Sequence, residues 1–144
     1  MIENIIAFLI YSYLGASFEH INYFFSNSKK ALSNPIITGF PLYGLGAYSI
    51  IITNNYLSNT NIFLKILIFA LVLSIIELIT GLYVGAGITN STGIISSWDY
   101  SNEPYNYKGI IDIKHFIIWG LLGVIITYIH PIIIKKIKYG IYSV

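Results

Sequence analysis

Two kinds of residue in this chain could do chemistry: a dense polar segment and two isolated acids. Residues 98–106 read WDYSNEPYN, which brings aromatic rings, two carboxylates, a proline and two asparagines together in one short stretch. Glu19 and Glu77, by contrast, each stand inside a long apolar run. A carboxylate buried at membrane depth is costly and usually faces a bundle interior or a wet cavity. Two such acids held close together could share a proton or bind a cation.

The elements that must position these residues are set by a very apolar composition. The chain has 144 residues, of which 56% are hydrophobic and 10% charged, and its mean hydropathy is +0.72. A small soluble domain cannot cover so apolar a chain with polar surface, so we expect an integral membrane protein with the lipid bilayer as its solvent. The net charge of +2 is spread over several short segments, which predicts no nucleic-acid partner. The absence of cysteine excludes disulfides and thiolate metal sites.

Four apolar runs are long enough to cross the hydrocarbon core, which takes about 20 residues of helix. They cover residues 5–25, 41–57, 62–84 and 113–134. We therefore predict an all-α fold: an integral membrane helical bundle of four transmembrane helices, forming a single transmembrane domain over residues 1–144. Pro41 suits the start of the second helix, and His130 and Pro131 are expected to mark the end of the fourth. A half-inserted fifth segment within residues 81–97 is the alternative.

The parity of the spans gathers the chemistry on one side. With four spans, the loops after the first and third helices share one membrane face, which we call face A; the termini and the short middle loop lie on the opposite face, face B. Glu19 lies ~9 Å and Glu77 ~10 Å below face A, from the rise per residue of a helix. The glycine-rich entry to the second helix, the 98–106 loop and His115 belong to the same face. Lysines are divided equally between the faces, so the positive-inside rule leaves the orientation open.

The two buried acids also have plainer readings. Either glutamate could reach the headgroups, hydrogen-bond a neighbouring helix, or pair with Lys108 or Lys114. The acids together with His20 and His115 lack the HxxxH or ExxH spacing of a metal site. We therefore expect no metal.

The polar loop has a plainer reading as well. Its aromatic residues suit the interfacial belt of any membrane protein. Asp99 and Ser101 could satisfy backbone amides of the loop, and Pro104 could fix a turn. On this reading the loop only caps the bundle.

Six segments of the chain, taken in order, resemble one bacterial membrane family. They are YSYLGASFE at residues 11–19, PLYGLGA at 41–47, ELITG at 77–81, WDYSNEPYNYKG at 98–109, WGLLG at 119–123 and HP at 130–131. The family is the one called "putative ABC-transporter type IV", or CmpB-like. The resemblance covers nearly the whole chain and implies a small multi-pass protein of the plasma membrane with a transport role. After Asn34 the chain lacks the arginine-containing run of the family, so an anion site resting on that arginine loses its support.

The resemblance and the residue pattern together divide the motif positions by expected role. The side chains expected to line a ligand cavity under face A are Glu19, Tyr43, Glu77, Trp98, Asp99, Tyr100, Asn106 and His115. The positions expected to shape the fold are Gly15, Pro41, Gly44, Gly46, Gly81, Ser101, Pro104, Gly109, Trp119 and Gly120. No cofactor is expected.

We predict that the chain is the membrane component of a transporter and binds a small solute or ion in this cavity. The sequence contains no GxxxxGK[ST] phosphate loop, so ATP dependence would require a separate ATPase, with self-association or a partner membrane subunit. One alternative is an intramembrane enzyme in which Glu19 and Glu77 act as acid and base on a lipid or its headgroup. Another is a structural or regulatory membrane subunit that binds no ligand.

Overall fold

The computed structural model describes residues 2–25, 35–84, 98 and 100–142, and within these ranges the chain is all-helical with no strand. The helices are α1 (Ile2–Phe25), α2 (Pro35–Tyr56), α3 (Ile62–Val84) and α4 (Ile113–Tyr142). The predicted all-α fold is confirmed for this part of the chain. The suggested fifth segment at 81–97 lies mostly outside the described residues.

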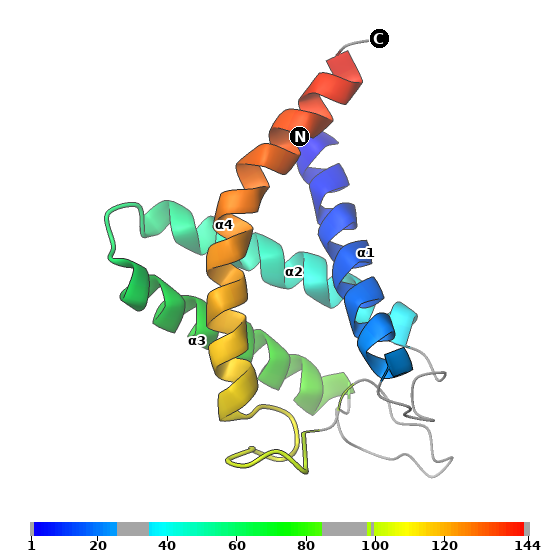
Figure 1. Cartoon of the computed structure of the whole chain (residues 1–144), viewed down its shortest axis with the longest axis vertical. Coiled ribbons are helices and arrows are strands. Elements are labelled where there is room, and N and C mark those ends of the chain that lie inside the picture. The colour runs from blue at the N-terminus through cyan, green and yellow to red at the C-terminus, as the bar shows by residue number, and fades with distance from the viewer. Residues whose placement is uncertain (1, 26–34, 85–97, 99, 143–144) are drawn as a thin grey trace.

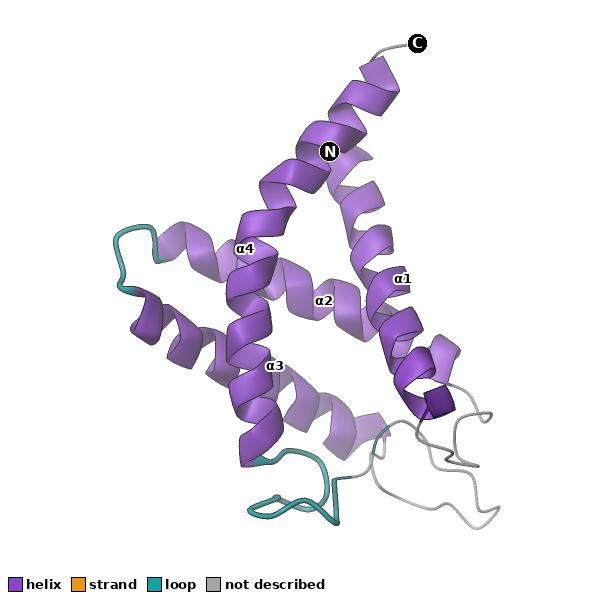
Figure 2. Ribbon diagram, in the orientation of Figure 1, coloured by secondary structure: helices purple, strands orange, loops and turns teal. Residues whose placement is uncertain are grey.

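The helices pack as two crossed pairs. Helices α2 and α3 form a hairpin, α4 crosses it chiefly against α3, and α1 packs chiefly against α2 (Figure 1). The start of α1 and the end of α4 lie together at one end of the molecule. The loop that precedes α4 lies at the other end, as Figure 2 shows. This loop, residues 98–112, therefore lies beside the C-terminal half of α3.

Glycines allow the helices of each pair to approach closely. A Cβ on Gly15 of α1 would lie 2.2 Å from the ring of Tyr43 on α2, and a Cβ on Gly44 would lie 2.3 Å from Ser12 Oγ on α1. On the other pair, a Cβ on Gly120 of α4 would lie 2.6 Å from the carbonyl oxygen of Ile66 on α3. Small residues at helix contacts are the usual means of bringing backbones together in membranes. The glycine-rich motifs thus lie where the helices cross.

Two prolines that were expected at helix ends lie inside helices, so these two predictions were wrong. Helix α2 begins at Pro35 and continues through Pro41; α4 continues through Pro131 to Tyr142. A proline inside a helix loses one backbone hydrogen bond, to the residue four positions earlier. Helices in membranes tolerate that loss when neighbouring helices and side chains satisfy the freed groups. His130 therefore lies within α4, where its Nδ1 is 3.1 Å from the Tyr11 hydroxyl of α1.

The apolar surface of the bundle faces outward. Among the described residues, two helices are long and apolar enough to cross a membrane, α3 over Ile62–Tyr83 and α4 over Ile113–Gly140, and α1 carries a shorter apolar stretch, Ile2–Phe18. In the most apolar 18-residue stretch of each helix, only 22% of α3 and 11% of α4 is buried within the protein. A core helix of a soluble protein would be mostly buried, so this exposure supports a membrane protein. Four spans remain a prediction.

Candidate functional site

Glu77 joins three parts of the chain. It lies near the C-terminal end of α3 and is 7% exposed. The Tyr100 hydroxyl donates a hydrogen bond of 2.9 Å to Glu77 Oε1, and the Trp119 indole Nε1 donates one of 2.9 Å to Oε2. Tyr100 belongs to the 98–112 loop and Trp119 to α4. One buried carboxylate therefore holds the loop and α4 against α3.

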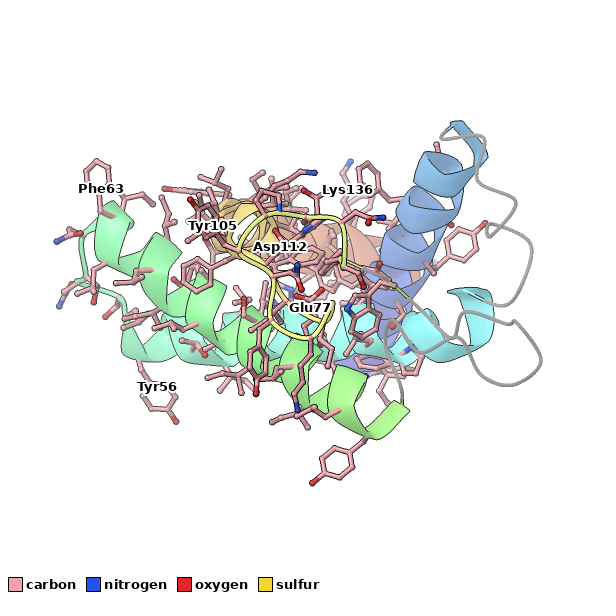
Figure 3. All side chains as sticks on the ribbon, turned by 90° about the horizontal axis from the view of Figure 1, so that it is seen from below. Tyr56, Phe63, Glu77, Tyr105, Asp112 and Lys136 are labelled. Atoms are coloured by element: carbon pink, nitrogen blue, oxygen red, sulfur yellow. The ribbon has the colours of Figure 1, made fainter. Side chains whose placement is uncertain are left out.

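Hydrogen bonds within the loop fold it into a compact cap. The Trp98 indole donates to the carbonyl of Ile110 at 2.8 Å, and the Tyr100 amide donates to the carbonyl of Gly109 at 2.9 Å. These bonds bring the two ends of the loop together. Figure 3, seen from the loop side, shows Glu77 and Asp112 within the outline of the loop. The cap thus presents Tyr100 to Glu77.

Asn106 fixes the tip of the loop. Its side-chain amide donates to the carbonyls of Glu103 at 2.8 Å and Ser101 at 3.3 Å, and its Oδ1 accepts from the Gly109 amide at 2.9 Å. Gly109 has a φ of 67°, a conformation that glycine adopts without steric cost. Asn106 was expected to line the cavity, and in the described structure its side chain bonds to the backbone of its own loop. Its contribution to the site is to hold the loop in shape.

Asp112 caps α4 and orients His115. Its Oδ1 accepts from the backbone amides of Lys114 at 2.8 Å and His115 at 3.0 Å, which is the pattern of a helix N-cap. Its Oδ2 pairs with His115 Nδ1. The His115 ring in turn stacks on the Tyr100 ring, with centroids 3.9 Å apart and planes 11° apart. Within the described residues, His115 Nε2 has no hydrogen-bond partner.

Asp112 was missed by sequence reasoning, although a signal was present. An aspartate directly before an apolar run is a typical N-cap, and Asp112 stands immediately before the fourth apolar run. The connected set of side chains is therefore Glu77, Tyr100, Asp112, His115 and Trp119, which we call the Glu77 cluster.

The remaining candidates divide between the loop, the helix crossing and the part not described. Trp98 is buried against Ile110 beside the cluster, and Tyr43 packs over Gly15 at the crossing of α1 and α2. Asp99 and the side chain of Glu19 lie outside the described residues, so the distance between Glu19 and Glu77 remains untested.

The motif residues expected to shape the fold are spread over the helices and the loop. Gly15, Gly44 and Gly120 occupy helix crossings, and Gly46 approaches Leu73 of α3 more loosely. Gly81 is buried on α3, one turn beyond Glu77. Ser101 and Pro104 lie in the exposed tip of the loop. Trp119, by contrast, belongs to the Glu77 cluster through its indole N–H.

The two lysines near the site, Lys108 and Lys114, contact side chains of the 98–112 loop. Lys114 Nζ forms an ion pair of 2.9 Å with Glu103 Oε1 at the surface of the loop, and Lys108 lies over the Tyr107 ring. In the described part of the chain, no three acidic or histidine side chains are grouped so that they could hold a metal ion.

A cavity of about 250 Å³ opens beside the cluster, between the loop, α3 and α4. Asp112 lines it together with Ser74, which lies one turn before Glu77 on α3. The Ser74 hydroxyl is buried and has no hydrogen-bond partner among the described residues. The other lining residues are Tyr105, Tyr107, Ile111, Ile113 and Phe116. The cavity thus has apolar walls with a few polar groups, as small-molecule sites commonly do.

Comparison with known proteins now decides the family. The model of the family described as "putative ABC-transporter type IV" matches residues 6–143. The chain belongs to this family. The match takes in α1 from residue 6 onward, the other three described helices and the 98–112 loop, so the Glu77 cluster is built entirely from family sequence. No curated protein and no solved structure matches the chain.

Membership of this family also indicates a general function. The family name and the apolar helices together indicate a transporter-associated membrane protein. Neither identifies a substrate.

Proposed function

We propose that the chain is the membrane component of a transporter, a four-span protein of the plasma membrane that binds a small solute or ion at the Glu77 cluster. The observation that carries the proposal is the position of Glu77, whose two carboxylate oxygens are bonded to the loop and to α4 from a buried place on α3. Intramembrane acids are costly, and in membrane proteins they mark solute and ion paths.

The chemistry of the two bonds restricts the ligand. Tyr100 and Trp119 both act as donors to Glu77. A ligand that takes over either oxygen must therefore be a proton, another cation or a hydrogen-bond donor such as an amine. The adjoining cavity of about 250 Å³ is suited to a small solute.

The same bonds offer a way to couple binding to movement. A ligand that displaces Tyr100 from Glu77 breaks a link between the loop and α3, and one that displaces Trp119 breaks a link between α4 and α3. Such a ligand binds the released form better than the linked form, and so it shifts the equilibrium between them. The 98–112 loop would then act as a gate on face A.

Energy must come from elsewhere if transport uses ATP. The sequence carries no phosphate-binding GxxxxGK[ST] loop. A separate ATPase is therefore part of the proposal, reached through self-association or a partner membrane subunit. Purification in mild detergent followed by mass measurement tests this part: a complex supports it, and a strict monomer counts against it.

Tryptophan fluorescence can test binding directly. The chain has only two tryptophans; Trp119 bonds to Glu77, and Trp98 is buried in the loop. Titration with sodium, potassium, methylammonium and protons should give a saturable emission change with at least one of them. Glu77→Gln should weaken that response about tenfold or more, since the ligand loses a charge-assisted contact.

The matched control is Glu103→Gln, which removes the same charge from the surface of the 98–112 loop instead of from α3. Glu103 pairs with Lys114 at the surface, and such pairs contribute little. This variant should respond as the wild type does. Equal responses of the wild type and Glu77→Gln to all four probes would refute the proposed site.

The Asp112–His115 pair favours an enzyme as the second candidate. An aspartate that holds histidine Nδ1 leaves Nε2 to take a proton, which is the arrangement of a general base. Here the base, His115, would act on a lipid or its headgroup from the start of α4.

Two variants separate the classes. In an enzyme, Glu77→Gln or His115→Gln should reduce turnover and preserve substrate affinity, whereas at a cation site Glu77→Gln should reduce affinity. A structural or regulatory subunit, the remaining alternative, would tolerate Glu77→Gln in a growth or assembly assay.

A further inference from the structure

A second polar cavity lies at the opposite end of α3 from Glu77. It has a volume of about 280 Å³ and lies between the α2–α3 connection and the middle of α4. Its lining residues are Asn54, Thr60, Ile62, Lys65, Thr127 and Tyr128. Lys65 and Glu77 are 12 residues apart on one helix, which corresponds to about 18 Å. This cavity is therefore separate from the Glu77 cluster.

Lys65 makes the cavity positive. The side chain is half-buried, and its Nζ donates a hydrogen bond of 3.1 Å to Asn54 Oδ1 on α2. No carboxylate among the described residues pairs with Lys65, and no acid lines the cavity. A half-buried ammonium without a counter-charge is costly, so an anion bound there would be stabilised.

The other groups around the cavity also favour an anion. Since Asn54 accepts from Lys65 through Oδ1, its side-chain N–H groups remain available as donors. Thr60 and Tyr128 add hydroxyl groups to the lining. The cavity also adjoins the start of α3, where the helix dipole favours negative charge.

We propose that this cavity binds a phosphate group, carried either by an anionic lipid headgroup or by free inorganic phosphate. The Lys65 ammonium and its neighbouring donor groups line one cavity, and its volume fits a phosphate group. Its position near the end of a membrane-crossing helix is the level at which headgroups lie. Neither the family match nor the proposed solute site involves these residues in binding.

Calorimetric titration of the full chain in neutral detergent tests the proposal with three probes: short-chain phosphatidylglycerol, short-chain phosphatidylcholine and inorganic phosphate. The wild type should bind phosphatidylglycerol or inorganic phosphate more tightly than phosphatidylcholine. Lys65→Gln should weaken that binding about tenfold or more, because a charge-assisted contact is lost. Lys65→Arg should retain it.

Two further variants make the result specific. Lys138→Gln removes the same charge from an exposed position on α4 and should leave binding within about twofold of the wild type, since exposed charges contribute little. Asn54→Asp places a carboxylate of nearly the same shape against Lys65, which should preserve the fold and weaken anion binding. It therefore remains informative if Lys65→Gln does not fold, which circular dichroism will show.

The pattern of binding identifies the source of the phosphate. If Lys65→Gln weakens binding of phosphatidylglycerol alone, the phosphate group belongs to a lipid headgroup. If Lys65→Gln weakens binding of inorganic phosphate, the ligand is the free anion. The proposal is overturned if neither anionic probe binds, or if Asn54→Asp and Lys65→Gln bind both as the wild type does. Because Glu77 takes no part, this outcome is independent of the tryptophan titration.

Discussion

Replacing Tyr100 by phenylalanine isolates the bond between the loop and Glu77. The substitution removes the hydroxyl that donates to Glu77 Oε1 at 2.9 Å. It keeps the ring that stacks on His115 and the backbone bond to Gly109. A hydrogen bond to a charged group contributes about 1.5–3 kcal/mol. We therefore expect Tyr100→Phe to lower the free energy of unfolding by about that amount.

The matched control is Tyr105→Phe, on the same loop. Tyr105 is 86% exposed, and no hydrogen bond of its hydroxyl is seen in the described structure. Removing the Tyr105 hydroxyl should change the free energy of unfolding by less than about 0.5 kcal/mol, as surface substitutions usually do. The measurement is denaturant unfolding in detergent micelles, followed by circular dichroism. Equal stabilities of the two variants would contradict the assigned bond.

A double-mutant cycle extends the same test. If Tyr100 acts through Glu77, Tyr100→Phe should cost less in a Glu77→Gln background, with a coupling energy of at least about 0.5 kcal/mol between the two sites. A coupling energy of zero would mean that the Tyr100 hydroxyl stabilises the protein by another route.

Two other substitutions test the packing and the cap. Gly44→Ala should destabilise the protein by about 1–3 kcal/mol, because its Cβ would meet Ser12 Oγ at 2.3 Å. The control, Gly140→Ala, places a Cβ with nothing within 4 Å and should be neutral or stabilising in the same unfolding assay. A larger loss of stability in Gly140→Ala than in Gly44→Ala would refute the close crossing. Asp112→Ala removes the cap of α4 and the partner of His115 and should cost about 0.5–2 kcal/mol. Asp112→Asn should recover most of that loss as a neutral cap; an equal loss in both variants would assign the stability to the charge of Asp112 instead.

The helices were predictable because hydrophobic length is a strong signal, but the helix ends assigned to prolines were wrong. Residues 62–84 form α3 as expected, since that run is long and mostly apolar and contains no proline. Pro41 and Pro131 were taken as helix ends by the rules that hold in water. Both lie inside helices, because an apolar surrounding leaves no solvent partner for an unwound backbone.

Some side chains of the Glu77 cluster were expected near one another, whereas the bonds between them were not. Glu77 and Tyr100 were both expected in one cavity, and the structure joins them. The bond from Trp119 could not be foreseen, because it spans 42 residues and depends on how α4 is rotated against α3. Trp119 was expected to shape the fold, and the sequence around it does not indicate which carboxylate accepts its indole hydrogen bond. Only the packed helices supply that information.

The two indole N–H groups of the chain offer the most direct test of the central claim, that Glu77 is the ligand-binding group. Trp119 Nε1 bonds to Glu77, whereas Trp98 Nε1 bonds to the carbonyl of Ile110. In NMR spectra of the protein labelled with ¹⁵N tryptophan, Glu77→Gln should shift the Trp119 indole resonance and leave that of Trp98 in place. At least one of sodium, potassium, methylammonium or protons should shift the Trp119 resonance saturably in the wild type and not in Glu77→Gln. A Trp119 resonance that ignores all four probes, or that responds equally in both proteins, would contradict the account.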